Sequence, residues 1–296
     1  MKVKVYAKLN LTLNVLGERN GFHIIDSVVA SVDIFDVVSV VPRNDTMITV
    51  AGLQQVPTEQ NAAYKAARAF IERFDGFESN SQADVNRLSG LDIVIEKGIP
   101  IGAGMGGSSA DIAAVIYALC SICNVDVDSP QIHSLCAELG SDVNYMLRGG
   151  LARLRGKGDN VEYSKLGSTI YFALTTFDTA MSTANVYSQF DKLQAEQTFT
   201  NNIALIETLS HKFVQGVTKC FNNHLQCAAN RLSNYADAYL QFCDKNGFAA
   251  NMTGSGSAYY VAFCDEHSAR DAVKLLEANG FTTVLCRTVH NGIELI

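Results

Sequence analysis

Hydrophobic and polar residues alternate along the first forty residues, the pattern of half-buried β-strands. The apolar positions of the first segment are Val3, Val5, Leu9, Leu11, Leu13 and Val15. Residues 17–21 interrupt the alternation with two glycines and an asparagine, so a turn is expected there. Further strands are predicted over 24–41, which is rich in Val and Ile, and over 46–50, 91–96 and 160–170.

The apolar period changes to 3.6 over 61–74, which predicts a helix. A second and clearer helix follows a glycine cluster and covers 112–123. Ser129 and Pro130 open a third helix that ends at Gly140, since proline is favoured in a first helical turn. The end of the chain is predicted as strand, helix and strand, a βαβ-like unit. These patterns predict a mixed α and β protein with two lobes.

Composition allows a sizeable packed core. The 296 residues are 48% hydrophobic and 18% charged, which excludes wholesale disorder. No apolar run approaches the roughly 18 residues that a membrane-spanning helix needs. The first seven residues alternate like a strand instead of forming the basic and apolar segments of a signal peptide. We therefore expect a cytoplasmic protein with no membrane partner.

The net charge of −7 comes without any block rich in Lys or Arg, which argues against a nucleic-acid partner. Eight cysteines are too few for a disulfide scaffold in a chain of this length, and we expect them to be reduced. Cys120, Cys123, His133 and Cys136 invite a zinc interpretation. Their spacing is not that of a known zinc finger, and the cysteines fall on apolar helical faces. We predict buried thiols and no metal site.

The most informative segment is the glycine-rich stretch 100–111, which follows a strand and opens a helix. Backbone N–H groups at a helix start lack intrahelical partners and attract anions, and glycines let a phosphate come close to them. Ser108 can cap this helix, with Asp111 completing a capping box. The residues predicted to cradle a phosphate-bearing cofactor are Pro100, Gly102, Gly104, Gly106, Gly107, Ser108 and Ser109.

Several kinds of glycine loop compete for this segment. Gly102, Gly104 and Gly107 match the G-x-G-x-x-G pattern of dinucleotide-binding oxidoreductases, but Asp126, the acidic residue at the required distance, lies in a predicted turn between helices. A Walker loop needs a lysine after the last glycine, and none is present. A protein-kinase glycine loop would continue into a strand. A tight turn that binds nothing is the remaining interpretation.

Two other motifs favour one family. Residues 7–11 read Ala-Lys-Leu-Asn-Leu, with Gly-Phe-His at 21–23, and residues 252–257 read Met-Thr-Gly-Ser-Gly-Ser. With them the chain resembles the GHMP small-molecule kinase superfamily over nearly its whole length, because its three motifs occur in the family's order. The resemblance implies an α+β fold, with a ribosomal-protein-S5-like nucleotide-binding lobe over 1–160 and a ferredoxin-like α/β lobe over 161–296. It also implies ATP and Mg²⁺ as cofactors.

Within the superfamily the chain is most similar to the branch that serves non-mevalonate isoprenoid biosynthesis. The residues that carry this similarity also include Leu-Gly-Ser-Asp-Val at 139–143, Gly-Lys-Gly at 156–158 and the segment 181–187. The resemblance implies phosphorylation of the 2-hydroxyl of 4-diphosphocytidyl-2-C-methyl-D-erythritol by a monomer or homodimer. Ala110, Asn144 and Phe22 depart from the branch pattern. Mevalonate, homoserine or a sugar therefore stay open as acceptors, and so does a silent GHMP-fold binding protein.

The resemblance also assigns roles to single residues. Asp142 becomes the base that takes the acceptor's hydroxyl proton, whereas from the sequence alone it could simply cap a helix. Lys8 becomes the partner of Asp142, although a strand lysine is more often solvated. Phe22 and Tyr187 would enclose the cytosine ring. The full set of residues expected to bind the acceptor is Asn10, Phe22, His23, Tyr187, Gly254, Ser255 and Gly256.

Overall fold

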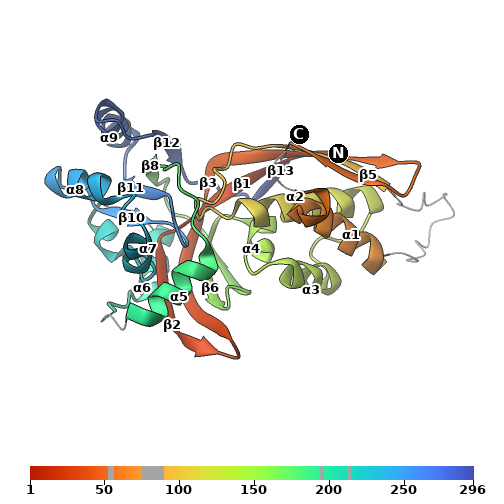
Figure 1. Cartoon of the computed structure of the whole chain (residues 1–296), viewed down its shortest axis with the longest axis horizontal. Coiled ribbons are helices and arrows are strands. Elements are labelled where there is room, and N and C mark those ends of the chain that lie inside the picture. The colour runs from red at the N-terminus through yellow and green to blue at the C-terminus, as the bar shows by residue number, and fades with distance from the viewer. Residues whose placement is uncertain (53–56, 75–89, 194–196, 212–214) are drawn as a thin grey trace.

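The structure is a computed structural model that describes residues 1–52, 57–74, 90–193, 197–211 and 215–296. The molecule is elongated (Figure 1). A layer of strands covered by helices forms one half, and a smaller helical and β lobe forms the other. The two ends of the chain lie close together at one edge of the larger layer (Figure 1).

The larger sheet is organised around β3 (Phe22–Arg43), which pairs with β1, β2, β5 and β6. Nine of the described strands belong to this sheet. The other members are β1 (Lys2–Asn10), β2 (Thr12–Arg19), β4 (Ile48–Ala51), β5 (Gly90–Glu96), β6 (Leu151–Gly156), β7 (Asn160–Ser164), β9 (Asn222–Asn223) and β13 (Ile293–Leu295). The predicted strands at 24–41, 46–50 and 91–96 are thereby confirmed. Only the first part of 160–170 is a strand, and β6 was not predicted.

The turn predicted over 17–21 is shorter than expected. β2 continues to Arg19, and the pairing with β3 shifts register between Val15 and Gly17. The reversal uses only Asn20 and Gly21, whose φ angles are 53° and 76°. Two consecutive left-handed residues form the two-residue hairpin turn that matches strand twist. The first glycine of the segment therefore serves as an irregularity within a strand.

Helices cover one face of this sheet (Figure 1). They are η1 (Thr58–Gln60), α1 (Ala62–Phe74), α2 (Gly107–Cys123), α3 (Pro130–Leu139) and α4 (Val143–Arg148). α2 packs against β1 and β3 on one side and against α1 and α4 on the other. Ten of its residues are buried. Close packing of this kind fixes the position of α2 against the sheet.

The smaller sheet has the order β10-β11-β8-β12 and contains β8 (Tyr171–Thr175), β10 (Ala250–Met252), β11 (Tyr259–Phe263) and β12 (Thr283–Arg287). α9 (Glu266–Ala278) connects β11 to β12, which confirms the predicted strand–helix–strand ending. The remaining helices are α5 (Thr183–Leu193), α6 (Asn202–His211), η2 (Gln215–Cys220), α7 (Gln226–Leu232) and α8 (Asp237–Lys245). Over the described ranges, no helix combines the length and the apolar character needed to cross a membrane.

Strands from the second half of the chain complete the larger sheet. β13 pairs with β1, and β9 pairs with β2. Phe172 and Tyr260 of the smaller sheet belong to the same apolar core as the larger sheet, and the Tyr260 hydroxyl donates a 2.9 Å hydrogen bond to the Asn10 carbonyl. The division at residue 160 stays a prediction. A cavity lies where these segments meet.

Candidate active site

A cavity of about 810 Å³ lies between the end of β1, the starts of α2 and α5, and the loop before β11. All of the predicted site residues line it except Phe22 and His23. The residues come from positions between 8 and 256, so the fold brings the three sequence motifs together at one place.

Two glycine loops form one wall of the cavity by packing backbone against backbone. A Cβ on Gly104 would lie 2.2 Å from the Thr253 carbonyl oxygen, and a Cβ on Gly254 would lie 2.5 Å from the Gly104 carbonyl oxygen. The Ala258 N–H donates to the Ala103 carbonyl across the same contact, at 3.2 Å. Only glycine permits this approach, because a Cβ on either residue would overlap backbone atoms of the other loop.

The glycine loop feeds directly into α2, which begins at Gly107. The predicted capping box at Ser108 and Asp111 is wrong: Ser108 lies inside the helix, and the N-cap is Gly106, in a left-handed conformation without any side-chain cap bond. Because no side chain occupies the first N–H groups, they can receive an anion, which the helix dipole also favours. The loop therefore fits the phosphates of a nucleotide.

Asp111 belongs instead to a buried cluster beside the loop. The Lys97 ammonium lies within hydrogen-bond distance of Asp36 and donates a 3.0 Å bond to Asp111 Oδ2. It also lies 3.5 Å from where a Cβ of Gly107 would be. Asp36 Oδ1 accepts the N–H groups of Gly98 and Ile99 at 2.7 and 2.8 Å. The cluster thus anchors the segment that leads from β5 into the loop.

Asp111 is 3% exposed, and its Oδ1 has no hydrogen-bond partner among the residues that the structure describes. Burial raises the pKa of this carboxyl to about 7. Lys97 opposes this increase in pKa, while the neighbouring Asp36 carboxylate adds to it. A carboxyl group that is protonated near neutral pH is consistent with a cluster of two acids and one lysine.

The centre of the cavity holds Lys8 and Asp142. Lys8 is 5% exposed, so the expectation that a strand lysine is solvated does not hold. Its Nζ donates a 2.6 Å bond to Asn10 Oδ1 and lies 3.4 Å from Asp142 Oδ2. Asn10 Oδ1 also accepts the Gly254 N–H at 3.0 Å, and Asn10 Nδ2 donates to Ser27 Oγ at 2.8 Å. The asparagine therefore connects the lysine to the second glycine loop.

Asp142 precedes α4, but its carboxylate makes no cap bond to that helix. The simple interpretation of Asp142 as a helix cap therefore lacks the bond it requires. The carboxylate is instead directed to Lys8, and its side chain stays 26% exposed. An aspartate that is partly open to the cavity and adjacent to a buried cation can accept a proton from a bound ligand.

Two of the residues expected to bind the acceptor, Phe22 and His23, begin β3 next to the turn of the β2–β3 hairpin. The His23 ring stacks on Tyr187 with centroids 4.4 Å apart, and its Nε2 lies 2.7 Å from Asp191 Oδ1. Phe22 is 59% exposed and faces the Lys157 ammonium, which is 5.7 Å from its ring centroid. Tyr187 reaches the cavity wall, whereas the placement of a ring between Phe22 and Tyr187 stays a prediction.

Several cavity residues were not predicted as site residues from the sequence. Those with polar side chains are Lys97, Asp111, Ser141, Lys157 and Thr183. Lys157 and Thr183 lie in segments that had been singled out, 156–158 and 181–187, and Lys97 lies between the predicted strand 91–96 and the glycine-rich stretch, so these positions were the available signal. The contact of Thr183 gave no signal: its hydroxyl is 2.9 Å from Ser255 Oγ, and the two residues are 72 positions apart.

Comparisons with known proteins agree with this geometry. Residues 61–152 match the family described as the GHMP kinases N terminal domain. A structure of 4-(cytidine 5'-diphospho)-2C-methyl-D-erythritol kinase aligns over 98% of this chain and 100% of its own, with a TM-score of 0.76 and 25% identity. A homoserine kinase from Cytophaga hutchinsonii has the same fold, with a TM-score of 0.69 and 17% identity over 100% of this chain and 97% of its own. The chain belongs to the GHMP kinases, which are small-molecule kinases that use ATP.

Within that family, similar curated relatives carry one name. A protein of Clostridium beijerinckii is 30% identical over 90% of this chain and 91% of its own length, and one of Clostridium tetani is 28% identical over 98% and 100%. Both are named 4-diphosphocytidyl-2-C-methyl-D-erythritol kinase.

A substitution in the glycine loop tests its role in nucleotide binding. In Gly106→Ala, the new Cβ meets Met146 Cε at 2.2 Å and the Lys8 stem at 3.3 Å, at a φ of 79°. We expect a calorimetric ATP affinity lower by about tenfold or more, because the loop must shift to accept the methyl group. Gly247→Ala is the matched control, with a φ of 70° but nothing within 4 Å. Equal ATP affinities of the two variants would contradict this role.

The Asp111 cluster predicts a pH-dependent stability. The native carboxyl holds its proton up to a pH of about 7, whereas in an unfolded chain aspartate titrates near pH 4. Unfolding then releases a proton, so the unfolding free energy should fall as pH rises from about 4 to about 7. Asp111→Asn should remove that fall, so that the variant gains up to about 3 kcal/mol relative to wild type across this window. Urea unfolding at several pH values measures it.

The control is Asp128→Asn, which changes a side chain that is 86% exposed. Its stability should follow that of wild type at every pH. Parallel curves for wild type and Asp111→Asn would show that the Asp111 proton does not contribute.

Proposed function

We propose that this kinase transfers the γ-phosphoryl group of ATP to the 2-hydroxyl of 4-diphosphocytidyl-2-C-methyl-D-erythritol, a step of non-mevalonate isoprenoid biosynthesis. The observation that carries the proposal is the Lys8–Asp142 pair, 3.4 Å apart beside a glycine loop that fits nucleotide phosphates. The names of the relatives that align along almost the whole chain support the acceptor. The cytoplasmic location and the monomeric or homodimeric state are parts of the same proposal.

Asp142 is the proposed general base. Its carboxylate takes the proton of the acceptor hydroxyl as the oxygen attacks phosphorus, which orients the nucleophile in line. Lys8 orients this carboxylate, because its ammonium lies 3.4 Å from Asp142 Oδ2. The ammonium can also contact the hydroxyl oxygen and stabilise the negative charge that develops there. An intact pair argues against a silent binding protein with this fold.

The nucleotide end is assigned to the glycine loop. Gly107, Ser108 and Ser109, the first residues of α2, line the cavity, and their N–H groups and the two serine hydroxyls would hold phosphate oxygens. When bound, ATP supplies the phosphoryl group and Mg²⁺ offsets the phosphate charge. No cluster of three or more His, Cys, Asp or Glu side chains suited to a metal occurs among the described residues. We therefore propose that Mg²⁺ enters with ATP, bound chiefly by phosphate oxygens.

The acceptor end is assigned to the opposite side of Asp142. Tyr187 and His23 already form a stacked pair, and Phe22 offers a further aromatic face nearby. Flat rings of this kind suit the cytosine base, because stacking needs only a π-face. Gly254, Ser255 and Gly256 line the cavity between the two ends and would contact the acceptor near the transferred group.

The acceptor is tested by measuring ADP release from ATP and Mg²⁺ with four alcohols. We expect turnover with 4-diphosphocytidyl-2-C-methyl-D-erythritol and none with mevalonate, homoserine or galactose. The physical reason is that mevalonate, homoserine and galactose lack the cytosine base and the diphosphate that the aromatic and cationic side chains can bind. Turnover with one of the other three would keep the kinase chemistry and reject the acceptor. Reduction of NAD(P) without ATP use would favour the oxidoreductase alternative.

The catalytic pair is tested by Lys8→Ala and Asp142→Asn. Each should lower kcat by a factor of about 10² to 10⁴, because each removes a group that acts on the transferred proton or its charge. Combining them should cost little more than either alone, since the two side chains act as a unit. Steady-state kinetics measures this, with unchanged thermal unfolding as evidence of an intact fold.

Lys4→Ala is the control on the same strand. Lys4 pairs with Glu294 at 4.0 Å and does not line the cavity, so its kcat should equal that of wild type. Turnover retained in either Lys8→Ala or Asp142→Asn would refute the proposed base and its partner.

A further inference from the structure

Three lysines line the cavity, and two of them are already bound to side chains of the protein. Lys8 is held by Asn10 and Asp142, and Lys97 is held by Asp36 and Asp111. Lys157 differs from both. Among the described residues its one ion pair is with Asp159, at 3.8 Å, and the two side chains are 39% and 37% exposed. Lys157 therefore has N–H donors available to a ligand.

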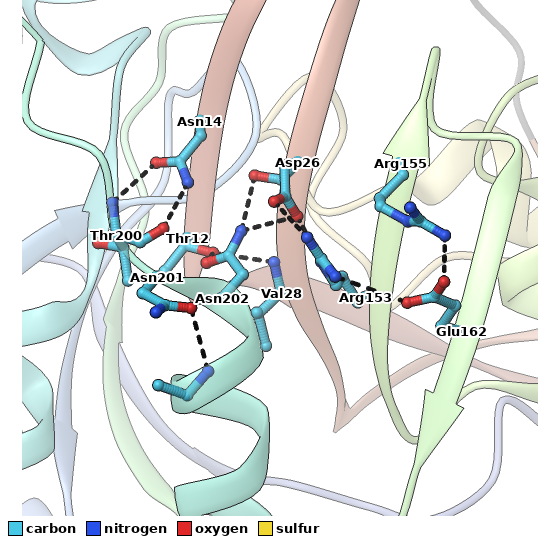
Figure 2. A network of polar contacts seen from close by, with 11 residues as sticks. Thr12, Asn14, Asp26, Val28, Arg153, Arg155, Glu162, Thr200, Asn201 and Asn202 are labelled. Carbon is cyan, nitrogen blue, oxygen red and sulfur yellow. Dashed lines mark hydrogen bonds and ion pairs between the residues drawn. The ribbon is translucent and has the colours of Figure 1, made fainter.

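The segment that carries Lys157 is firmly held. Arg153 and Arg155 precede it at every second position of β6 and the following turn. Arg153 forms a two-pronged contact with Asp26 of β3, at 2.8 and 2.7 Å, and Arg155 pairs with Glu162 of β7. Figure 2 shows this network joining the three strands. The first two cations of the row are thus neutralised, and the third stands in the turn beyond them.

The network in Figure 2 also continues away from the turn. Asn202, at the start of α6, donates to the Asp26 carbonyl and to its carboxylate, both at 2.9 Å, and Thr12 donates to Asn202 at 2.7 Å. Hydrogen bonds to Arg153 and Asn202 lower the pKa of Asp26, although burial opposes them. Asp26 therefore holds Arg153 and β6 in place, and the turn of the β6–β7 hairpin has a defined position.

That place is next to the proposed base, on the side away from the glycine loop. A Cβ on Gly158 would lie 3.7 Å from Asp142 Oδ1 and 3.4 Å from Ser141 Cβ. The other carboxylate oxygen, Oδ2, faces Lys8, whose Cε lies 3.3 Å from where a Cβ of Gly106 would be. Asp142 thus separates the nucleotide cradle from the hairpin turn. Lys157 also faces the ring of Phe22, at 5.7 Å.

We propose that Lys157 binds the diphosphate of the acceptor. This inference rests on the proposed function, because it needs an acceptor that carries phosphate. A lysine ammonium forms charge-assisted hydrogen bonds with phosphate oxygens. Its three N–H donors can reach oxygens of two adjacent phosphates. Because Lys157 lies beside Asp142 and Phe22, its ammonium would stand between the reacting hydroxyl of the acceptor and the aromatic side chains proposed to bind the cytosine ring. Lys157 would thereby select a phosphorylated acceptor over a neutral alcohol.

The test separates acceptor binding from nucleotide binding. In Lys157→Ala, we expect the KM for 4-diphosphocytidyl-2-C-methyl-D-erythritol to rise by about tenfold or more, with kcat within about twofold and the KM for ATP unchanged. Cytidine diphosphate, titrated calorimetrically with a non-hydrolysable ATP analogue saturating the other site, should bind more weakly by a similar factor. The difference from wild type should shrink as salt increases.

Two further variants complete the experiment. Lys157→Arg keeps the charge and should retain most of the affinity for cytidine diphosphate. Lys165→Ala removes an exposed lysine that follows β7 and lies outside the cavity, so both KM values should equal those of wild type.

The outcomes distinguish this inference from the proposed function. Unchanged acceptor KM and cytidine diphosphate affinity in Lys157→Ala would overturn the inference and leave the proposed function standing. Equal losses for ATP and acceptor would overturn it too, because the lysine would then act on the nucleotide. Absence of cytidine diphosphate binding to wild type would also reject it. Lys157-dependent binding of cytidine diphosphate without any turnover of the expected acceptor would support the inference and reject the proposed acceptor.

Discussion

The close approach of two glycine loops is the constraint on which the rest of the site depends. Gly104 and Gly254 come from segments about 150 residues apart, and a Cβ on either one would clash with the backbone of the other loop. This contact joins the start of α2 to the loop before β11. Asn10 completes the junction by accepting the Gly254 N–H while it holds the Lys8 ammonium. The proposed catalytic pair is thus positioned by backbone packing as much as by its own charges.

The two largely buried lysines of the cavity each lie next to an acidic side chain. Lys8 has a carboxylate beside it, and Lys97 has two. Buried charges are stable only when they are paired and hydrogen-bonded in this way. Lys157 differs from these two lysines, because its ammonium is 3.8 Å from Asp159 and its side chain is 39% exposed. A cation in that condition costs little to redirect toward a ligand, whereas moving Lys97 would leave two buried acids without their partner.

Sequence patterns predicted the elements well where the pattern is local. The helices over 61–74 and after the glycine loop follow from apolar periodicity alone, and the loop's affinity for anions follows from helix geometry. The prediction failed at Ser108 and Asp111, which match a capping box by spacing. The helix starts two residues earlier than that motif requires, and the Asp111 carboxyl group accepts a hydrogen bond from Lys97 instead. A competing tertiary contact had decided between two locally acceptable arrangements.

By itself, the sequence determined most of the strands and helices, the anion-binding character of the glycine loop and the family that the motifs resemble. These properties depend on residues that are neighbours along the chain, or on motifs that keep a fixed order. The family resemblance also implied that Lys8 pairs with Asp142, as the structure has it. Only the tertiary structure decided that Asp36 and Asp111 share Lys97 and that Lys157 remains open to the cavity. Ion pairs form through space, and the partners of each pair lie on segments whose proximity is set by packing of the whole core.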